Sequence, residues 1–370
     1  MSTFQQTLAE FEQAYLIQQS EGRQLAPATM RAGLGIEQSM VAAWLDAPLG
    51  AYFHGTAEDQ VVYQLRAQLF LAEHFPDHFL LFRGVAPDLG IALTASILGV
   101  PWVSAPDKAP WARHDPPITR PSDLDDRPLP DFATVGMMPH LLRLHAEMKA
   151  LVEGTLGVGF PIWLRGPLGQ AFYLAGAEQT LMSMYTDPDF FLRLMRYGMD
   201  VMAHWNAERC AYLGETPQIW GTLFNDEVSA ENFSPEFYLE LVAPFDREFA
   251  AAFTGGIDFH SCGNTTPLMP AIASVAPWKQ FHVSAWSDLD TALRTFPSTP
   301  LIISLHPYRE VLGCDFADTS RRIRDIIARC GDHPFYLAIG ELMPVHGPQR
   351  DLQRLQDVWA LCKELFSDSR

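Results

Sequence analysis

The feature that most constrains this chain is a regular alternation that begins near residue 158 and continues toward the C-terminus. Short apolar runs alternate with longer segments whose apolar residues recur every three or four positions, which is typical of strands followed by helices. The six predicted strands lie at residues 158–166, 216–226, 257–262, 279–286, 300–307 and 334–341. Two more apolar runs precede them, at residues 79–84 and 101–105. Eight strands that alternate with helices predict an α/β fold, a TIM (β/α)8 barrel.

The N-terminal part of the chain has a different pattern. Residues 4–19, 39–53 and 57–76 carry apolar residues at helical spacing. We therefore expect an N-terminal helical extension over residues 1–76 and the barrel over residues 77–370. The proline-rich run 101–130 resists regular structure and is too long for an ordinary connection, so we interpret it as a structural arm rather than a lid.

Charge and cysteine usage limit the partners and the compartment. The 370 residues carry a formal net charge of −18, which disfavours nucleic acid and anionic membrane surfaces as partners. The first residues lack the basic start and apolar core of a signal peptide, and no run of about 18 apolar residues follows, which predicts a cytoplasmic protein. Five scattered cysteines, an odd number, argue for reduced thiols rather than a disulfide framework.

The segment IDFHSCGN, residues 257–264, is a candidate metal site. His260 and Cys262 are two positions apart on a predicted strand, so their side chains share a face and can converge on one ion. A divalent transition metal such as zinc takes imidazole, thiolate and carboxylate ligands, and a catalytic site keeps three of them plus an open position. Glu341, at the tip of the last predicted strand, is the expected third ligand. Cys314 is the alternative third ligand, and simple packing of His260 and Cys262 inside the strand end is the alternative to a metal site.

Other polar residues follow the predicted strands at the end where barrels of this class carry their chemistry. Asp226 and Glu227 are candidates for substrate binding or for general acid and base roles, and Asn225 for orienting a carbonyl or carboxylate. Arg165 is a candidate partner for an anionic substrate group. The alternatives are that the acidic residues cap a helix and that Arg165 forms a surface ion pair.

Four segments, in this order, resemble a known family: RGPLGQAFYLAG, DPDFFLRLM, NDEVSAENFSPEFYLELVAPF and FHSCGN. The chain is similar over roughly residues 75 to 365 to the uroporphyrinogen decarboxylase superfamily, and especially to its zinc-dependent corrinoid and coenzyme M methyltransferase branch. The resemblance implies a TIM barrel in which His260, Cys262 and a later cysteine would hold zinc. Glu341 stands where that cysteine is expected, and a carboxylate there makes the metal harder and more Lewis acidic. Relatives often carry a Gly-Asn pair where this chain has SLHP, residues 304–307. The resemblance therefore makes His306 a candidate added ligand or acid/base group.

From these residues and the resemblance, we expect a metal-dependent methyltransferase-like enzyme. It would transfer a methyl group between a small substrate and a corrinoid on a partner protein or tetrahydrofolate. Asp226 and His306 are the predicted catalytic residues, and Arg165, Asn225 and Glu227 the predicted substrate-binding residues. The alternatives are a metal-independent decarboxylase or lyase acting on a carboxylated substrate, and a non-catalytic barrel that binds a ligand. A homodimer formed through the N-terminal helices is left open.

Overall fold

The computed structural model describes residues 3–105, 108–113, 115–162 and 165–366. The strands are β1 (Ala32–Ile36), β2 (Gly84–Val85), β3 (Trp102–Ala105), β4 (Lys108–Ala112), β5 (Gly157–Val158), β6 (Trp220–Phe224), β7 (Gly256–His260), β8 (Gln280–Val283), β9 (Leu301–Ser304) and β10 (Phe335–Leu342).

The α-helices are α1 (Phe4–Ser20), α2 (Gln38–Trp44), α3 (Leu49–Phe53), α4 (Ala57–His74), α5 (Ala92–Ile97), α6 (Met138–Leu151), α7 (Pro167–Ala175), α8 (Ala177–Thr186), α9 (Pro188–Leu213), α10 (Pro235–Phe237), α11 (Ala243–Ala251), α12 (Met269–Ala273), α13 (Leu289–Thr295), α14 (Phe316–Cys330) and α15 (Pro348–Phe366). Short 3-10 segments are η1 (Pro27–Met30), η2 (Pro121–Leu124) and η4 (Thr266–Leu268), and π-helical segments are η3 (Tyr238–Val242) and η5 (Pro307–Leu312). Within the described ranges, no helix combines the length and apolar character needed to cross a bilayer.

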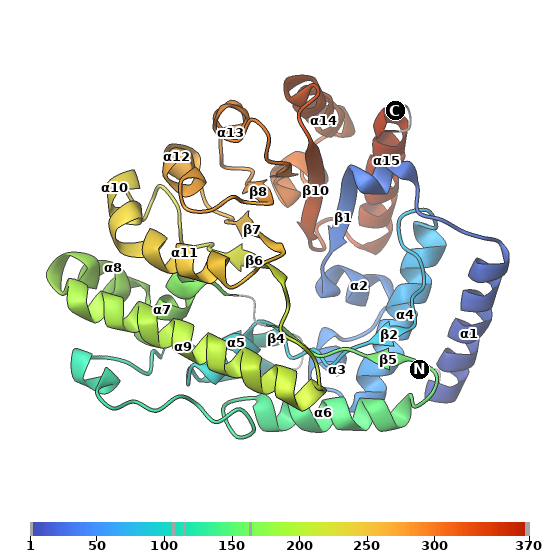
Figure 1. Cartoon of the computed structure of the whole chain (residues 1–370). Helices are drawn as coiled ribbons and strands as arrows, with labels where there is room; N and C mark the ends of the chain where they lie inside the picture. The colour runs from blue at the N-terminus through green and yellow to red at the C-terminus, as the bar shows by residue number, and fades with distance from the viewer. Residues whose placement is uncertain (1–2, 106–107, 114, 163–164, 367–370) are drawn as a thin grey trace.

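Six strands form one parallel sheet in the order β1-β10-β9-β8-β7-β6. The sheet curls, and α11 to α15 lie outside it (Figure 1). The strands β2 and β5 form a separate parallel pair, and β3 and β4 form an antiparallel hairpin. In the part of the chain that is described, no ladder joins the β2–β5 pair to the six-stranded sheet, so the ring of strand pairing is open.

Side-chain and loop hydrogen bonds span the two gaps in the ring. On one side, the Leu34 N–H of β1 donates to Nε2 of His78 at 2.9 Å, where a neighbouring strand would supply a carbonyl. On the other side, the Gly166 N–H donates to the carbonyl of Phe224 in β6 at 2.7 Å. These bonds connect the β2–β5 region to the sheet without extending its ladder.

The predicted alternation of strands and helices is confirmed from β6 to α15, but one predicted barrel strand is wrong and one strand of the sheet was not predicted. Residues 101–105 form β3 of the hairpin instead of a barrel strand. The segment expected to be a helical extension contains β1, which pairs with β10. Of residues 79–84, only Gly84 lies in a strand, and of the described part of 158–166, only Val158 does. Residues 163–164 of that predicted strand lie outside the described residues. The division at residue 76 stays a prediction, although a strand on its N-terminal side belongs to the main sheet.

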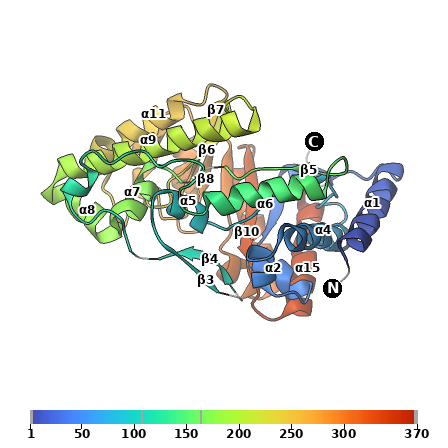
Figure 2. The same cartoon turned by 90° about the horizontal axis from the view of Figure 1, so that it is seen from below.

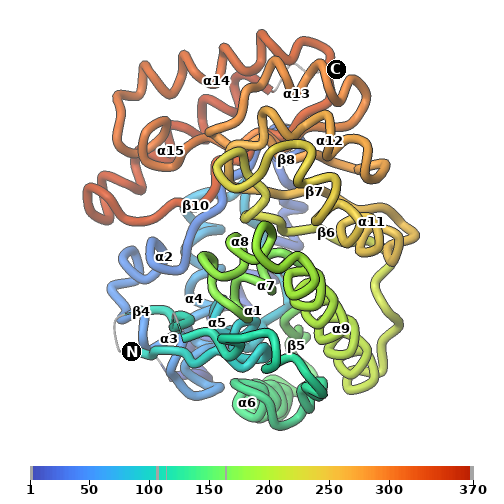
Figure 3. Tube along the Cα trace, turned by 90° about the vertical axis from the view of Figure 1, so that its left-hand side faces the viewer, coloured from blue at the N-terminus to red at the C-terminus, as the bar shows by residue number. Residues whose placement is uncertain are grey.

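The proline-rich run 101–130 is an arm that carries the hairpin and η2. His54 anchors the hairpin, because its Nε2 lies 3.0 Å from the Ala105 carbonyl and 3.2 Å from the Lys108 carbonyl. Figure 2 shows β3 and β4 apart from the other strands. In Figure 3, α6 lies at the opposite side of the molecule from α13 and α14.

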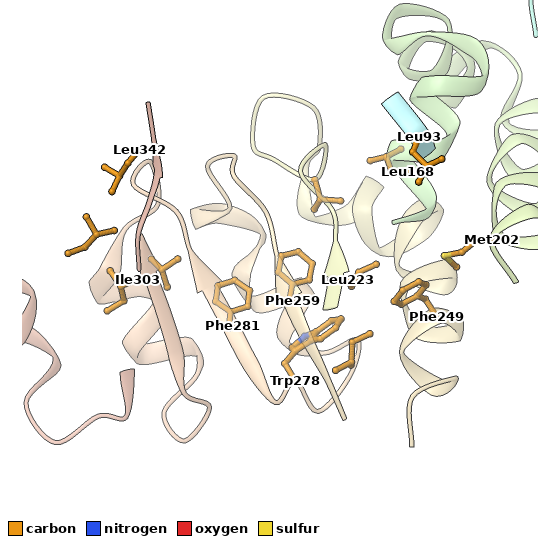
Figure 4. Packing of buried hydrophobic residues seen from close by; sticks show 14 of the residues in the cluster. Leu93, Leu168, Met202, Leu223, Phe249, Phe259, Trp278, Phe281, Ile303 and Leu342 are labelled. Carbon is orange, nitrogen blue, oxygen red and sulfur yellow. The ribbon is translucent and has the colours of Figure 1, made fainter. Parts of the chain in front are cut away.

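Packing of aromatic side chains around β7 and β8 sets the orientation of the candidate site. Phe259 is buried and stacks on Phe281 of β8, with ring centroids 5.3 Å apart, and meets Trp278 edge-on at 5.2 Å (Figure 4). Because successive side chains of a strand point to opposite faces, burial of Phe259 turns His260 to the other face of the sheet.

Candidate metal centre

The register of β6 and β7 brings together three side chains that could hold a metal ion. Phe224 stands opposite His260 in the ladder, and the next N–H, of Asn225, donates to the His260 carbonyl at 2.8 Å. Asp226 follows directly, so its carboxylate reaches His260 and Cys262. Donor atoms of Asp226, His260 and Cys262 all lie within 4.8 Å of one another. His260 Nε2 is 3.3 Å from Cys262 Sγ and 3.4 Å from Asp226 Oδ1.

Asp226 is held as an anion. Burial raises its pKa, but hydrogen bonding to His260 and the charges of His260 and Arg165 lower it to about 2. Arg165 Nη1 donates to Asp226 Oδ2 at 2.5 Å, and the Cys262 N–H donates to Asp226 Oδ1 at 3.1 Å. An ionised Asp226 can accept a proton or bind a cation at neutral pH, but it has no proton to give.

Cys262 lies close to two carboxylates, those of Asp226 and Glu341. Burial, Asp226 and Glu341 together raise the pKa of its thiol well above the usual range. The thiol donates to Glu341 Oε1 at 3.7 Å. A divalent cation at this point would offset the two carboxylates and hold the sulfur as a thiolate. Imidazole, thiolate and carboxylate are a donor set that zinc and related metals accept, so the residues fit such a metal.

Glu341 adopts a backbone conformation that a glutamate rarely takes. Its φ is +56°, and in the described ranges the other non-glycine residues with positive φ are both aspartates, Asp46 and Asp126. Aspartate tolerates the left-handed region better than glutamate, so the conformation of Glu341 is the less expected. Residues held in such strain cluster at functional sites.

The predicted substrate-binding residues occupy two different environments. Arg165 and Glu227 lie next to the cluster. Arg165 Nη1 donates to Asp226 and lies 3.5 Å from Glu227 Oε1. Burial raises the pKa of Glu227. Asn225 is fully buried instead, and its side-chain N–H donates to Asp246 Oδ2 at 2.8 Å.

Among the described residues, the contacts of His306 and Cys314 are with side chains and backbone outside the cluster of Asp226, His260 and Cys262. His306 Nδ1 accepts the N–H groups of Tyr308 and Arg309, each at 3.2 Å. Cys314 Sγ is 3.4 Å from Thr319 Oγ1. It lines a cavity of about 590 Å³ whose lining includes none of the three clustered residues. The structure therefore does not bring Cys314 to His260 and Cys262 as the alternative third ligand.

Sequence patterns did not reveal one contributor, His282 of β8. Its ring stacks on the ring of His260 at 4.1 Å and 15°. Its Nδ1 lies 2.8 Å from the Ser261 carbonyl and its Nε2 lies 2.7 Å from Ser304 Oγ. Burial, together with His260, lowers the pKa of His282 to about 4, so it backs His260 as a neutral ring. A single histidine within the apolar run 279–286 was the available signal.

Comparisons with known proteins agree with this architecture. Residues 87–360 match the family described as Uroporphyrinogen decarboxylase (URO-D). The chain is 28% identical over 192 residues to a methylated-thiol–coenzyme M methyltransferase of Methanosarcina mazei, over 50% of this chain and 48% of that protein. It thus spans about half the length of the curated relative it matches.

One solved structure, described as a methyltransferase from Methanosarcina mazei, has the same fold. It superposes with a TM-score of 0.61 at 13% sequence identity, over 93% of this chain and 94% of that one. At that identity the likeness concerns the fold alone. With the family match, it confirms the predicted α/β barrel class, here with an open ring of strand pairing.

Proposed function

The chain belongs to the uroporphyrinogen decarboxylase family, and from that membership we propose that it is a metal-dependent methyltransferase. It moves a methyl group between a small molecule and a carrier, which is a corrinoid on a partner protein or tetrahydrofolate. The observation that carries the proposal is the convergence of Asp226, His260 and Cys262 within 4.8 Å. The similarity to a curated methyltransferase supports the reaction class.

The proposed ligands are His260, Cys262 and Glu341, with Asp226 as a further oxygen donor. When bound, a divalent metal supplies Lewis acidity that polarises the heteroatom bearing or receiving the methyl group. The chain's own residues position the donors. Arg165 fixes Asp226, and His282 fixes the plane of the His260 ring. His306 remains the candidate proton carrier outside the cluster.

The ligand set bears on the choice of substrate. The curated relative is named for a methylated thiol and coenzyme M. A carboxylate at position 341 makes the metal harder than a thiolate would, which favours an oxygen- or nitrogen-bearing substrate. The lyase alternative needs a cation for a carboxylated substrate, and Arg165 is already paired with Asp226 and Glu227. This pairing favours the methyltransferase.

The first test is the metal content of the purified, untagged protein, measured by elemental analysis. We expect about one divalent metal per chain in the wild type, as for a mononuclear catalytic site. Cys262→Ser, Asp226→Asn and Glu341→Gln should each reduce the occupancy, because each removes a donor. Cys314→Ser is the matched control and should retain the metal.

Absence of metal from the wild type after reconstitution under reducing conditions would contradict the proposal and promote the lyase alternative. Loss in Asp226→Asn but not in Glu341→Gln would assign the carboxylate ligand to Asp226. The reverse pattern would assign it to Glu341.

A further inference from the structure

A cavity of about 740 Å³ lies beside the candidate metal centre. The proline-rich arm forms one wall with Trp111 and Arg113, and α7 and α8 form the other with Phe172, Tyr173 and Met182. Trp111 is 54% exposed, although an indole normally gains from burial. Aromatic side chains around an open space, with Arg113, Glu178 and Gln179 as polar groups in the lining, indicate a place for a small molecule.

Glu227 connects this cavity to the metal centre. It lines the cavity, and Arg165 Nη1 bonds Asp226 while lying 3.5 Å from Glu227 Oε1. Arg165 also lies over the ring of Tyr173, with its guanidinium carbon 5.9 Å from the ring centroid. Glu227 and Arg165 therefore lie between a molecule in the cavity and Asp226 of the candidate metal centre.

The size and the walls of the cavity define the kind of molecule. Its volume falls within the roughly 300–1,000 Å³ of pockets that enclose drug-sized ligands, whereas a one-carbon donor such as methanol would leave most of it filled with water. Three aromatic side chains line it, and aromatic rings pack on other rings in stacked or edge-on geometry. The aromatic part of the lining suits a planar ring, and Arg113, Glu178 and Gln179 can meet polar groups on it.

The polar group at the inner end is Glu227. Its Oε2 is buried without a hydrogen-bond partner among the described residues. A Cβ at Gly169 of α7 would come within 2.8 Å of this oxygen, so the glycine makes room for the carboxyl group. Glu227 can thus hydrogen-bond a hydroxyl or amine on the ring of a bound molecule.

We propose that the cavity binds the aromatic body of the methyl donor, a compound whose methyl group sits on an oxygen, nitrogen or sulfur attached to an aromatic ring. This inference rests on the proposed function. In the transfer, the bond between the methyl carbon and the heteroatom breaks, and the carbon forms a bond to the nucleophilic centre of the carrier. The electron pair stays on the heteroatom, which takes up a proton, and the ring delocalises that pair while the bond breaks.

Direct binding to the metal-loaded protein tests the inference without turnover. Titration calorimetry would compare a methoxyphenol with methanol and trimethylamine. We expect the methoxyphenol to bind at least about tenfold more tightly, since a ring buried against aromatic walls gains more than about 1.4 kcal/mol. Trp111→Ala should weaken this binding about tenfold by removing one wall. Met182→Trp should weaken this binding by a similar factor, because the larger side chain fills the cavity. Since Met182 lies on α8, this variant tests the cavity without changing the hairpin that Trp111→Ala could misfold.

The matched controls are Trp102→Ala and Tyr185→Ala. Trp102 is an exposed indole on the same hairpin and Tyr185 an exposed ring on α8, and neither lines the cavity. Both should bind the methoxyphenol within about twofold of the wild type. Equal binding of methanol and the methoxyphenol, or equal losses in the controls and the cavity variants, would overturn the inference.

Metal analysis of the same samples separates this inference from the proposed function. If a protein without metal binds the methoxyphenol, and this binding depends on Trp111 and Met182, the proposed metal-dependent function is refuted and the inference about the cavity is supported. Metal bound by His260 and Cys262 without ring binding would support the function and refute the aromatic substrate. Displacement of the methoxyphenol by tetrahydrofolate would reassign the cavity to the carrier, which also refutes the inference.

Discussion

At the scale of single residues, Glu341 combines a strained backbone conformation with a side chain that contacts the candidate ligand cluster. Its φ of +56° places an L-residue in the left-handed region, and its carboxylate lies 3.7 Å from Cys262 Sγ. The left-handed conformation costs roughly 1–2 kcal/mol for a residue with a Cβ. A carboxylate required at this position would explain why the strain is retained.

This strain predicts a gain in stability when the side chain is removed completely. Glu341→Gly should have a free energy of unfolding about 1 kcal/mol above that of Glu341→Ala, because alanine keeps the Cβ that the left-handed backbone disfavours. Urea unfolding of both variants in the presence of a chelator measures the difference. An alanine variant as stable as the glycine variant would show that the backbone at residue 341 is not strained.

A second residue, Asp246, predicts a pH dependence of stability. Burial raises its pKa to about 7, against hydrogen bonds from Asn225 and Tyr238 that lower it. Its pKa in the unfolded chain is about 3.9, so between these values only the folded state keeps the proton. Its contribution to stability is therefore fully present below about pH 4 and is lost as the pH rises through about 7.

Asp246→Asn should remove this dependence, because an amide does not ionise. Relative to the wild type, the variant should gain up to about 4 kcal/mol between pH 4 and pH 8, three pKa units at about 1.4 kcal/mol each. Urea unfolding at both pH values, with chelator present, measures the gain. A difference between the two proteins that stays constant with pH would refute the prediction.

The spacing of His260 and Cys262 pointed to the pair, although β7 ends at His260 and Cys262 lies in the loop that follows instead of on the strand. That Asp226 lies next to His260 and Cys262 depends instead on the register between β6 and β7. His282 depends in the same way on β8 lying next to β7. Contacts between strands are not encoded in either segment alone, so the sequence made Asp226 a candidate acid or base but not a metal ligand, and it did not reveal His282.

At the scale of elements, the loop that carries Arg165 depends on Gly166. A Cβ at Gly166 would lie 2.5 Å from Asn225 Oδ1 and 2.8 Å from the Phe224 carbonyl. Gly166→Ala should lower the free energy of unfolding by about 1–3 kcal/mol, since the clash with backbone cannot be relieved cheaply. Gly340→Ala is the matched control, because a Cβ at Gly340 meets nothing within 4 Å. Equal stabilities of the two variants in urea would contradict this prediction.

Strand predictions succeeded where apolar periodicity was local and failed where a strand depends on distant partners. The strands β6 to β10 lie in apolar runs, and the sequence located them. The strand β1 reads AGLGI, in which two glycines give no strand signal, and it is stabilised by pairing with β10 from the other end of the chain. The run at 101–105 has strand composition, but its nearest partner is β4 and not the barrel.

At the scale of the whole molecule, the sheet ties together the two sides of the predicted boundary at residue 76. The ladder from β1 to β10 crosses it, and Trp44 Nε1 donates to the Pro348 carbonyl at 3.0 Å. A chain of residues 77–370 should therefore lack the cooperative thermal transition of the full chain, as measured by circular dichroism. A fragment that melts cooperatively near the full-length temperature would instead establish the barrel as an independent domain.

The open ring of strand pairing divides the molecule into parts of unequal stiffness. Asp226, His260, Cys262 and Glu341 lie on or next to strands of one continuous ladder, whereas the walls of the aromatic cavity lie across the gap after β5. Amide protons of β7 to β10 should exchange with solvent slowly, and those around β5 quickly, because a two-residue pair opens at little cost. The residues of the candidate metal centre then keep their spacing while the opposite wall of the cavity adjusts to molecules of different width. Tolerance toward different molecules would come from the gap between β5 and β6, and fidelity of the chemistry from the six-stranded sheet.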